Sequence, residues 1–280
     1  MSKTSGTLYL VGTPIGNLGD LSRRAIDTLG AVTVIACEDT RRSRILLQHA
    51  GIDTPLVSLP AFDEKRRAAG FIDRLLAGDD VALVTDAGMP GISDPGSEVV
   101  RLAVEADVRV VPIPGASAPL AALAASGLPT ERFTFVGFLP RKGGGRKEAI
   151  EELHHAIGTL LLFESPRRLR ETLMDLRDEL GDRRACVARE LTKVHEEFAR
   201  GTLSELIEHF SGEILGEITI VIEGGSRAKA EEGVDLDQLL QARLDAGLST
   251  KDAAREISEA YGLPRKELYR RALELASRSE

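Results

Sequence analysis

Short runs of apolar, often β-branched residues alternate along the chain with longer stretches in which apolar side chains recur every three or four positions. The short runs have the length of buried strands, and the longer stretches have the period of amphipathic helices. Strands that alternate with helices are typical of a largely parallel sheet. In the first part of the chain we expect strands over residues 7–12, 32–37, 56–59, 81–86 and 108–113, with helices over 21–29, 63–77 and 98–105.

A second series of strands and helices follows an Ala/Leu-rich helix predicted over residues 118–126. The change between the two series places a domain boundary between residues 115 and 130. We therefore expect two α/β domains, over residues 1–117 and 118–226. In the second domain the pattern predicts strands over 133–138, 159–164, 185–190, 195–201 and 217–224, and helices over 146–156, 166–180 and 203–210.

The last part of the chain, residues 227–280, has a different composition. Residues 226–237 are polar and acidic, which is typical of a linker. Ser249 is placed to cap the second of three following helices, and Gly262 and Pro264 separate it from the third. The arrangement resembles a helix-turn-helix, although a small bundle that supports packing or dimerisation fits the interspersed acidic residues equally well. The three helices are predicted over 236–246, 250–261 and 265–276.

Charge and cysteine content exclude several classes of protein. The 36 Lys and Arg against 44 Asp and Glu give a net charge of −8, which disfavours a protein that coats nucleic acid nonspecifically. Aromatic residues make up 4%, which argues against single-strand binding by stacked bases. No apolar run approaches the roughly 18 residues that cross a bilayer, and no secretory signal is present, so we expect a soluble cytoplasmic protein. Cys37 and Cys186 are expected as buried free thiols, and no metal-ligand spacing occurs.

Five segments place glycine, proline and acidic residues where predicted strands end. In open α/β sheets the carboxyl ends of the strands are where ligands bind. Residues 86–96 hold three Gly, two Pro and two Asp in eleven positions, so this stretch is a shaped loop with no regular structure. The other four segments are 11–20, 37–44, 112–118 and 161–168.

Two kinds of ligand compete for these loops. Gly12, Gly16 and Gly19 follow a strand, and Glu38 comes about twenty residues later, which imitates a dinucleotide fingerprint. However, Pro14 removes an N–H from the turn that would hold the pyrophosphate, and the glycine spacing is wrong, so NAD is disfavoured. S-adenosylmethionine has no phosphates and is bound by backbone amides, carbonyls and a few carboxylates. The bare apolar turns of these loops suit that ligand better.

Nine short motifs occur in order across residues 8–225: TPIGN, EDTR, DAG-x-P-x-ISDPG, PG-x-SA, SGLP, F-x-GFLP, FESP-x-R, RELTK and GE-x-x-x-VIEG. Together they resemble the tetrapyrrole-methylase superfamily. More narrowly, they are similar to its family of bacterial enzymes that 2′-O-methylate a cytidine in 16S ribosomal RNA. The resemblance implies two α/β domains with an S-adenosylmethionine cleft between them, a small C-terminal helical domain, and a homodimer.

The resemblance also implies a set of cofactor-binding residues. The loop around Gly88 holds the cofactor, and Leu191 lies on the turn within RELTK. Met89 stands where the superfamily carries an acid, so Asp86 and Asp94 become the candidates for polar contacts. The implied set is Pro14, Asp86, Ala87, Gly88, Met89, Ile92, Asp94, Ser117, Ala118, Phe163, Glu164 and Leu191.

One segment departs from the family. Pro60, Phe62 and Asp63 stand where relatives tend to carry His and Asn, so a substrate role carried over to that stretch is in doubt.

The candidate catalytic residues lie in RELTK. Methyl transfer is an in-line displacement to which the protein mainly contributes positioning, and a general base assists a ribose hydroxyl. None of the five histidines has a persuasive position for that role. The candidates are Lys193, with a lowered pKa, and Glu190, as the base or as the group that orients Lys193. An ion pair that ties two strands is the structural alternative.

Three basic clusters border the ligand loops, and they fit guidance of an RNA phosphate backbone. The segment RKGGGRK, residues 141–147, is expected to be a flexible cationic loop. The expected partner is small-subunit ribosomal RNA or the assembled 30S subunit. A methylase of a tetrapyrrole or of a modified protein residue, and a nucleic-acid-binding regulator with a degenerate methylase body, are the alternatives. The candidate RNA contacts are Arg41, Arg141, Lys142, Arg146, Lys147 and Arg167.

Overall fold

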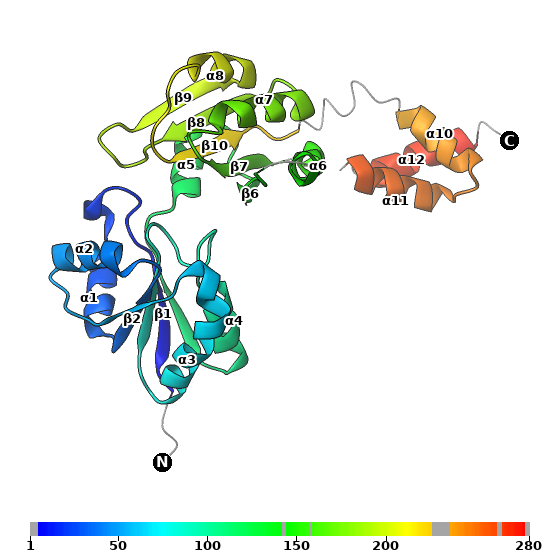
Figure 1. Ribbon diagram of the computed structural model, residues 1–280. Helices are drawn as coiled ribbons and strands as arrows, with labels where there is room; N and C mark the ends of the chain where they lie inside the picture. Colours follow the sequence, from blue (N-terminus) through cyan, green and yellow to red (C-terminus); the bar gives the residue numbers. More distant parts are fainter. Residues whose placement is uncertain (1–4, 142–143, 157, 226–235, 262–264, 278–280) are drawn as a thin grey trace. The chain divides into compact units, whose positions relative to one another are not determined.

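The computed structural model describes residues 5–141, 144–156, 158–225, 236–261 and 265–277. The chain divides into two compact units, whose elements are labelled in Figure 1. The first unit comprises residues 1–122 together with 189–197, and the second comprises residues 123–188 and 198–280. No helix within the described ranges is long and apolar enough to span a membrane.

The first unit contains five strands: β1 Thr7–Val11, β2 Val34–Cys37, β3 Leu56–Ser58, β4 Val81–Val84 and β5 Arg109–Ile113. They form one sheet in the order β3-β2-β4-β1-β5. Every neighbouring pair is parallel, so all five strands end at the same edge of the sheet. β2 and β4 are buried at every position, as expected for strands that are covered on both faces.

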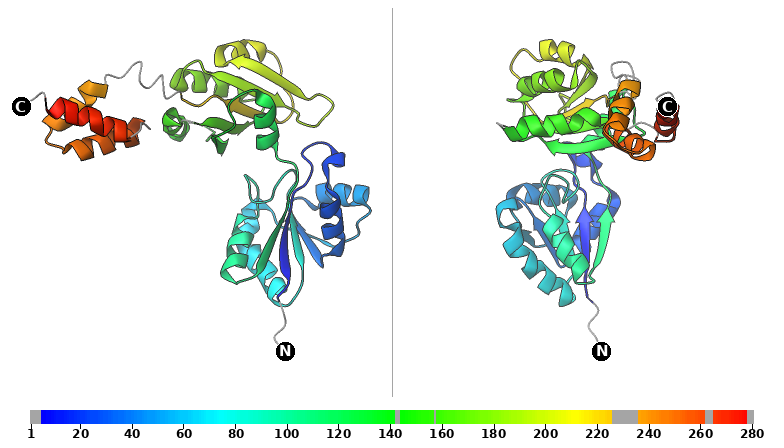
Figure 2. Two further views of the ribbon diagram at one scale, coloured as in Figure 1. Left: turned by 180° about the vertical axis from the view of Figure 1, so that it is seen from behind. Right: turned by 90° about the vertical axis from the view of Figure 1, so that its right-hand side faces the viewer.

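Four helices cover this sheet: α1 Arg23–Ala31, α2 Thr40–Ala50, α3 Glu64–Leu76 and α4 Ser97–Glu105. Leu29 of α1 packs in one core cluster with Ile35, whereas Phe71 of α3 packs in another with Val34. Because neighbouring residues of a strand point to opposite faces, the two clusters lie on opposite sides of the sheet. Figure 2 shows the helices on both sides. Two 3-10 turns, η1 Leu18–Asp20 and η2 Ala61–Asp63, follow β1 and β3.

The helix α2 corrects the sequence-based expectation of a loop over residues 37–44. Asp39 is its N-cap, and the Oδ1 atom accepts a hydrogen bond from the backbone N–H of Arg41 at 2.8 Å. This cap starts the helix at Thr40, within the polar stretch. The hydrophobic pattern misses that start because the first buried apolar residue of α2, Leu46, comes almost two turns later.

The second unit contains a second five-stranded sheet: β6 Phe133–Phe138, β7 Thr159–Glu164, β8 Arg184–Arg189, β9 Glu197–Thr202 and β10 Ile218–Ile222. Its order is β6-β7-β10-β8-β9. β6 and β7 are parallel, but β7 and β10 are antiparallel, so this sheet is mixed. Helices α6 Gly144–Glu152, α7 Leu169–Leu180 and α8 Leu203–His209, with the turn η3 Leu153–His155, pack on it.

A three-helix bundle ends the described chain: α10 Leu236–Asp245, α11 Thr250–Tyr261 and α12 Arg265–Ala276. It has a hydrophobic core of its own around Leu240, Ile257 and Leu268. Ser249 caps α11 as predicted, because its Oγ accepts a hydrogen bond from the backbone N–H of Asp252 at 3.1 Å. Most of the predicted linker, and the Gly262 and Pro264 breaker, lie outside the described residues.

The helix α5, Ala118–Ser126, crosses from the first unit to the second, and its bounds are those that the sequence predicts. Residues 189–197, which form the turn between β8 and β9, are grouped with the first unit although they are distant from it in sequence. The predicted domain limits at residues 117 and 226 stay predictions. Cys37 and Cys186 are both free and buried, and burial raises the pKa of each thiol.

Candidate functional site

Two loops at the carboxyl edge of the first sheet are joined by their backbones. The N–H of Thr13 donates to the carbonyl of Gly88 at 2.9 Å, and the N–H of Gly88 donates to the carbonyl of Thr13 at 3.1 Å. The hydroxyl of Thr13 is buried and donates to the carbonyl of Thr85 at 3.1 Å. The TPIGN segment after β1 and the long loop after β4 therefore form one rigid assembly.

A third loop joins this assembly through two glycines in direct backbone contact. A Cβ atom added to Gly12 would lie 2.7 Å from the Cα of Gly115, and one added to Gly115 would lie 2.7 Å from the carbonyl oxygen of Gly12. No side chain fits at either position, which explains both glycines. The segment PGASA after β5 is thereby held against the segment after β1.

The long loop of residues 86–96 leaves space beside Gly88, which is itself buried. This glycine has a φ of +80°, and a Cβ atom there would approach only the carbonyl of Ala116 and the side chain of Ile15, both at 3.7 Å. The far end of the loop is fixed by Glu64 of α3, whose Oε1 accepts hydrogen bonds from the N–H groups of Gly96 at 2.9 Å and Glu98 at 2.8 Å. The loop is thus anchored at its end and leaves space for a small group beside Gly88.

The RELTK turn between β8 and β9 is strained and packs against TPIGN. Glu190 and Thr192 both have left-handed backbones, with φ values of +52° and +65°. A Cβ atom on Gly16 would lie 2.6 Å from the Cγ of Lys193 and 2.9 Å from the carbonyl of Leu191. Strain of this kind persists only where the surrounding structure imposes it, and it concentrates at functional sites.

The two candidate catalytic residues form an ion pair within this turn. The Nζ of Lys193 lies 2.8 Å from the Oε1 of Glu190, and both side chains are mostly buried. The pair lies within one turn of four residues, so it does not tie two strands together. The catalytic role of the pair stays a prediction.

Three carboxylic acids interact electrostatically beside the same loops. Burial, followed by the charges of Glu38 and Asp86, raises the pKa of Asp94 to about 6. Burial and the charge of Asp86 also raise the pKa of Glu38. Asp86 lies 3.1 Å from Arg42, but its Oδ1 is buried without a hydrogen-bond partner. In the described part of the chain no group of three or more His, Cys, Asp or Glu is arranged to hold a metal ion.

The structure gathers most of the expected cofactor residues in the first unit. The residues of this unit come from the loops after β1, β4 and β5 and from the RELTK turn; they are Pro14, Asp86, Ala87, Gly88, Met89, Ile92, Asp94, Ser117, Ala118 and Leu191. The carbonyl of Ser117 accepts the first hydrogen bond of α5, from the N–H of Ala121 at 2.9 Å. Phe163 and Glu164 belong to the second unit. The role of each in binding stays a prediction.

Glu164 is buried and hydrogen-bonded within the second unit. Its side chain is 1% exposed and accepts hydrogen bonds from the N–H of Ser165 at 2.6 Å, from Arg168 at 2.8 Å and from the hydroxyl of Thr172 at 2.6 Å. Thr172 in turn accepts from Arg146 at 2.9 Å. This network shapes the FESPRR turn and gives both carboxylate oxygens partners within the second unit.

The cationic segment RKGGGRK differs from its expected form. Residues 144–147 lie in α6, where the composition predicts a flexible loop, and Lys142 lies outside the described residues. Arg146 is only 6% exposed, and its guanidinium pairs with Asp175 at 2.7 Å. We therefore remove Arg146 from the candidate RNA contacts, because a buried, paired guanidinium does not reach a phosphate.

The other candidate RNA contacts that the structure describes are exposed. Arg141 and Arg167 lie at the surface, and Lys147 lies on α6 within 4 Å of Glu151 and Glu179. Arg41 is 89% exposed and forms a pair of hydrogen bonds with Asp39, which lowers the pKa of that carboxyl to about 2. These four cations remain available to a polyanion at the surface.

The segment that departs from the family has a local structural role. Asp63 pairs with Arg66 and Arg67, each at 2.7 Å, and these guanidinium groups hold the pKa of its carboxyl well below the usual range. Phe62 is 92% exposed. The aspartate thus fixes the first turn of α3.

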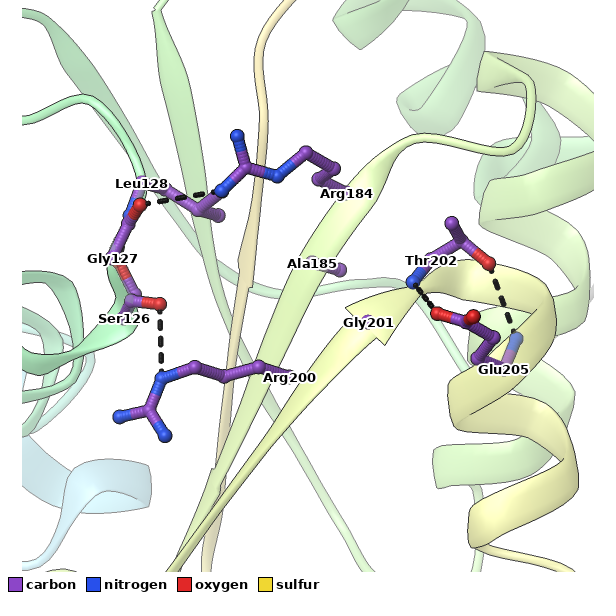
Figure 3. Close-up of a pocket in the computed structure, with 9 residues that line it drawn as sticks. All are labelled: Ser126, Gly127, Leu128, Arg184, Ala185, Arg200, Gly201, Thr202 and Glu205. Atoms are coloured by element: carbon purple, nitrogen blue, oxygen red, sulfur yellow. Dashed lines mark hydrogen bonds between the residues drawn. The ribbon is translucent and has the colours of Figure 1, made fainter.

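The SGLP motif forms a pocket of about 320 Å³ in the second unit (Figure 3). Its turn, Ser126 to Leu128, faces Arg184 and Arg200 across the pocket. The guanidinium of Arg200 donates to the carbonyls of Ser126 at 3.2 Å and Ala125 at 2.6 Å, which are the last residues of α5. A cation at a helix C-terminus satisfies its unpaired carbonyls. This motif therefore ends α5 and anchors it to β9.

Comparison with known proteins now identifies the family. Residues 7–207 match the model of the Tetrapyrrole (Corrin/Porphyrin) Methylases, and residues 230–276 match that of the RsmI C-terminal HTH domain. The chain belongs to the tetrapyrrole methylase family. Its relatives include the protein named Ribosomal RNA small subunit methyltransferase I in Halalkalibacterium halodurans, which is 45% identical over 94% of this chain and 93% of its own length. The Synechocystis protein of the same name is 46% identical over 96% and 98%.

Solved structures support the methylase fold at lower identity. Diphthine synthase superposes with a TM-score of 0.63 at 18% identity, over 78% of this methylase and 90% of that chain. The expected fold class, with two α/β sheets and a helical C-terminal part, is thus confirmed.

Sequence reasoning missed three residues that build the site. Thr13 joins the loops after β1 and β4, Gly115 sets the contact with Gly12, and Glu64 holds the end of the long loop. Thr13 belongs to the TPIGN motif and Gly115 to the PG-x-SA motif, so the motifs already marked both positions in the sequence. Glu64 looks like any first-turn helix acid, and only its contacts reveal its role.

Proposed function

We propose that this methylase transfers the methyl group of S-adenosylmethionine to the ribose 2′-oxygen of a cytidine in 16S ribosomal RNA. The observation that carries the proposal is the close relationship, over nearly the whole chain, to proteins named Ribosomal RNA small subunit methyltransferase I. The backbone-lined loops of the first unit support a methylase site, and the exposed arginines support a polyanionic substrate.

The loops fit a nucleoside cofactor better than a dinucleotide. Gly88 offers an open left-handed turn, and Pro14 removes one N–H that a pyrophosphate would use. The buried Oδ1 of Asp86, which has no partner, suits a hydroxyl or amino donor on a ligand. S-adenosylmethionine, when bound, supplies the activated methyl carbon. The residues that would hold it are those around Gly88, Ser117 and Leu191.

We assign Lys193 and Glu190 the task of orienting the ribose. The ion pair fixes both side chains on a strained turn that packs against Gly16. The Nζ of Lys193 is suited to donate to an oxygen of the substrate, and Glu190 holds the lysine. Correct orientation of the reacting groups accounts for about 7–11 kcal/mol of rate enhancement in favourable cases.

The active form that we propose is a homodimer in the cytoplasm, acting on small-subunit ribosomal RNA or the assembled 30S subunit. Methylation of a tetrapyrrole or of a modified protein residue is the second candidate, because diphthine synthase and a uroporphyrin III C-methyl transferase from Thermus thermophilus share the fold. The helical C-terminal part, which matches the RsmI C-terminal HTH domain, favours the ribosomal RNA substrate.

Mapping 2′-O-methyl groups on 16S ribosomal RNA tests the proposal. Cells that lack the gene should lose one 2′-O-methylcytidine, and the wild-type gene should restore it. The purified protein should also transfer tritiated methyl groups from S-adenosylmethionine to 30S subunits or to naked RNA, which identifies the substrate form. An unchanged map of 2′-O-methyl groups in cells that lack the gene would contradict this function. Methyl transfer to a porphyrin would support the alternative.

A further inference from the structure

Four phenylalanines gather on one face of the second sheet, at its β6 edge. β6 is the edge strand, and its residues Phe133, Phe135 and Phe138 pair in register with Thr159, Leu161 and Phe163 of β7. Side chains of register partners in neighbouring strands share a face. The opposite face carries Leu160 and Leu162, which pack in the helical core. The phenylalanine face therefore lies away from α6, α7 and α8.

A bulge in β6 is what aligns these side chains. Phe133 and Phe135 are two residues apart and share a face, but Phe138 is three residues further and would point the other way in a regular strand. The register shifts between Phe135 and Gly137, and Gly137 has a φ of +74°. This one-residue bulge returns Phe138 to the phenylalanine face, next to Phe163.

The rings form an exposed aromatic surface. Phe138 is 56% exposed and Phe133 is 45% exposed, although both belong to a sheet. Phe163 contacts Phe135 edge to face, with centroids 5.1 Å apart, and lies 5.4 Å from Phe138 in a tilted arrangement. We call Phe133, Phe135, Phe138 and Phe163 the phenylalanine platform. Half of the eight phenylalanines of the chain are in it, so the low aromatic content is locally concentrated.

Exposed arginines border the platform at both ends. Arg132 directly precedes Phe133, and Arg141 follows β6 by three residues. Arg167 lies in the turn after β7, which Arg168 ties to the end of β6 by donating to the carbonyl of Leu139 at 3.5 Å. Arg132, Arg141 and Arg167 form no ion pair within the part of the chain that the structure describes. Aromatic faces flanked by guanidinium groups match the chemistry of a single-stranded nucleic acid.

We propose that the phenylalanine platform stacks unpaired bases of the RNA substrate while Arg132, Arg141 and Arg167 contact its phosphates. The inference rests on the proposed function for its ligand class. The border favours RNA over a second copy of the chain. Its three arginines outnumber Glu131, the exposed acid next to Arg132, so two copies placed face to face would bring like charges together. Stacking tolerates any base, so the platform supplies affinity and orientation, and it does not supply sequence specificity.

A single tryptophan tests this proposal directly, because the chain contains none. In Phe138→Trp the indole replaces one ring of the platform. A 12-nucleotide oligocytidylate RNA should quench its fluorescence at least twofold, because a stacked base quenches indole emission. In the control Met174→Trp, on α7 and 37% exposed, the same RNA should leave emission unchanged. Inorganic polyphosphate, which has the charge without the bases, should quench neither variant.

Affinity measurements complete the test. Replacing Phe133 and Phe138 with leucine keeps apolar surface but removes two aromatic faces. Loss of stacking at each base corresponds to roughly a 5- to 140-fold loss of RNA affinity. Met174→Leu should bind RNA like the wild type. Unquenched emission from Phe138→Trp, equal quenching by polyphosphate, or unchanged affinity of the double leucine variant would overturn the proposal. Emission from Phe138→Trp that depends on protein concentration without RNA would assign the platform to a second copy instead.

These outcomes are separable from failure of the proposed function. Oligonucleotide binding does not require methyl transfer, and methyl transfer by the wild-type enzyme is measured independently. A wild type that methylates 16S ribosomal RNA while the leucine variants keep their KM for RNA would reject the platform alone. Normal quenching in Phe138→Trp, together with a wild type that methylates no RNA, would reject the proposed function alone.

Discussion

Glycines at the carboxyl edge of the first sheet serve two different purposes. Gly12 and Gly115 are needed because their backbones touch, and any side chain would separate the loops after β1 and β5. Gly88 is needed for its backbone conformation, since the space around it would admit a methyl group. Only the second kind leaves room for a ligand, which makes Gly88 the better position for a test of cofactor binding.

We expect Gly88→Ala to weaken S-adenosylmethionine binding at least tenfold, because the added methyl group occupies the open turn. The left-handed backbone should also destabilise the fold by about 1–2 kcal/mol. Gly51→Ala is the matched control: its φ is +68° and nothing lies within 4 Å of the added Cβ. Calorimetric titration of both variants checks this. Equal affinities would place the binding loop elsewhere.

Asp94 makes stability depend on pH. Its folded pKa of about 6 is above the ordinary value of 3.8, so the folded state binds this proton more tightly than the unfolded state. The contribution of the protonated Asp94 to the free energy of unfolding is fully present below pH 3.8, and it is lost as the pH rises through about 6. Asp94→Asn should therefore be more stable than the wild type at pH 8, by on the order of 1–3 kcal/mol, with no difference near pH 4. Urea unfolding at both pH values checks the sign, and a pH-independent difference would contradict it.

At the scale of elements, the helix α6 shows how packing changes the role of a charge. Arg146 and Arg141 lie five positions apart in one basic segment, yet Arg146 is buried against Asp175 and Thr172 of α7 while Arg141 is at the surface. A buried guanidinium with partners on a neighbouring helix holds the two helices together. The same residue type therefore stabilises the fold at one position and is available to RNA at the other.

We expect the two arginines to separate stability from RNA binding. Arg146→Gln should destabilise the protein by about 2–4 kcal/mol, because Asp175 loses its partner. Arg141→Gln should leave stability unchanged but lower the log–log salt slope of RNA binding by about one. Both variants change the net charge equally, so each controls for the other. An unchanged slope in Arg141→Gln would remove this residue from the RNA path.

At the scale of the whole molecule, separate hydrophobic cores predict separate unfolding. The C-terminal bundle has its core around Ile257. This core shares no residue with the core around Leu173 of α7, which packs against the second sheet. Ile257→Ala should lower a bundle transition, with a loss of about 2–4 kcal/mol, and leave the main transition in place. Leu173→Ala should have the opposite effect. Calorimetry of both full-length variants checks this, and a single shared transition would contradict it.

The net charge of −8 also acts at this scale, because it repels a polyanion from most of the surface. Favourable contact with RNA is then confined to local groups of exposed arginines. The border of the phenylalanine platform is one such group, and its position explains why an acidic protein is compatible with a ribosomal RNA substrate.

The sequence predicts most elements closely because they depend on local periodicity. The bounds of α5, α11 and α12 match the expected ranges, since apolar spacing and neighbouring turn residues define a helix locally. The parallel first sheet follows from strands that alternate with helices. The start of α2 was missed because its cap, Asp39, precedes a polar first turn. The antiparallel direction of β10 was missed because the apolar pattern of a strand does not show which way its neighbour runs.

The sequence by itself determined the family, the loops at the strand ends and the residues that the motifs imply, because these are encoded by residue type and order. Tertiary structure decided which of these loops are joined to one another and which side chains already have partners within the protein. Arg146 is engaged by Asp175 and Thr172, which are distant from it in sequence, whereas space remains beside Gly88 and Phe138 is turned outward by a bulge. Burial and partner choice depend on contacts between distant segments, and no local pattern contains them.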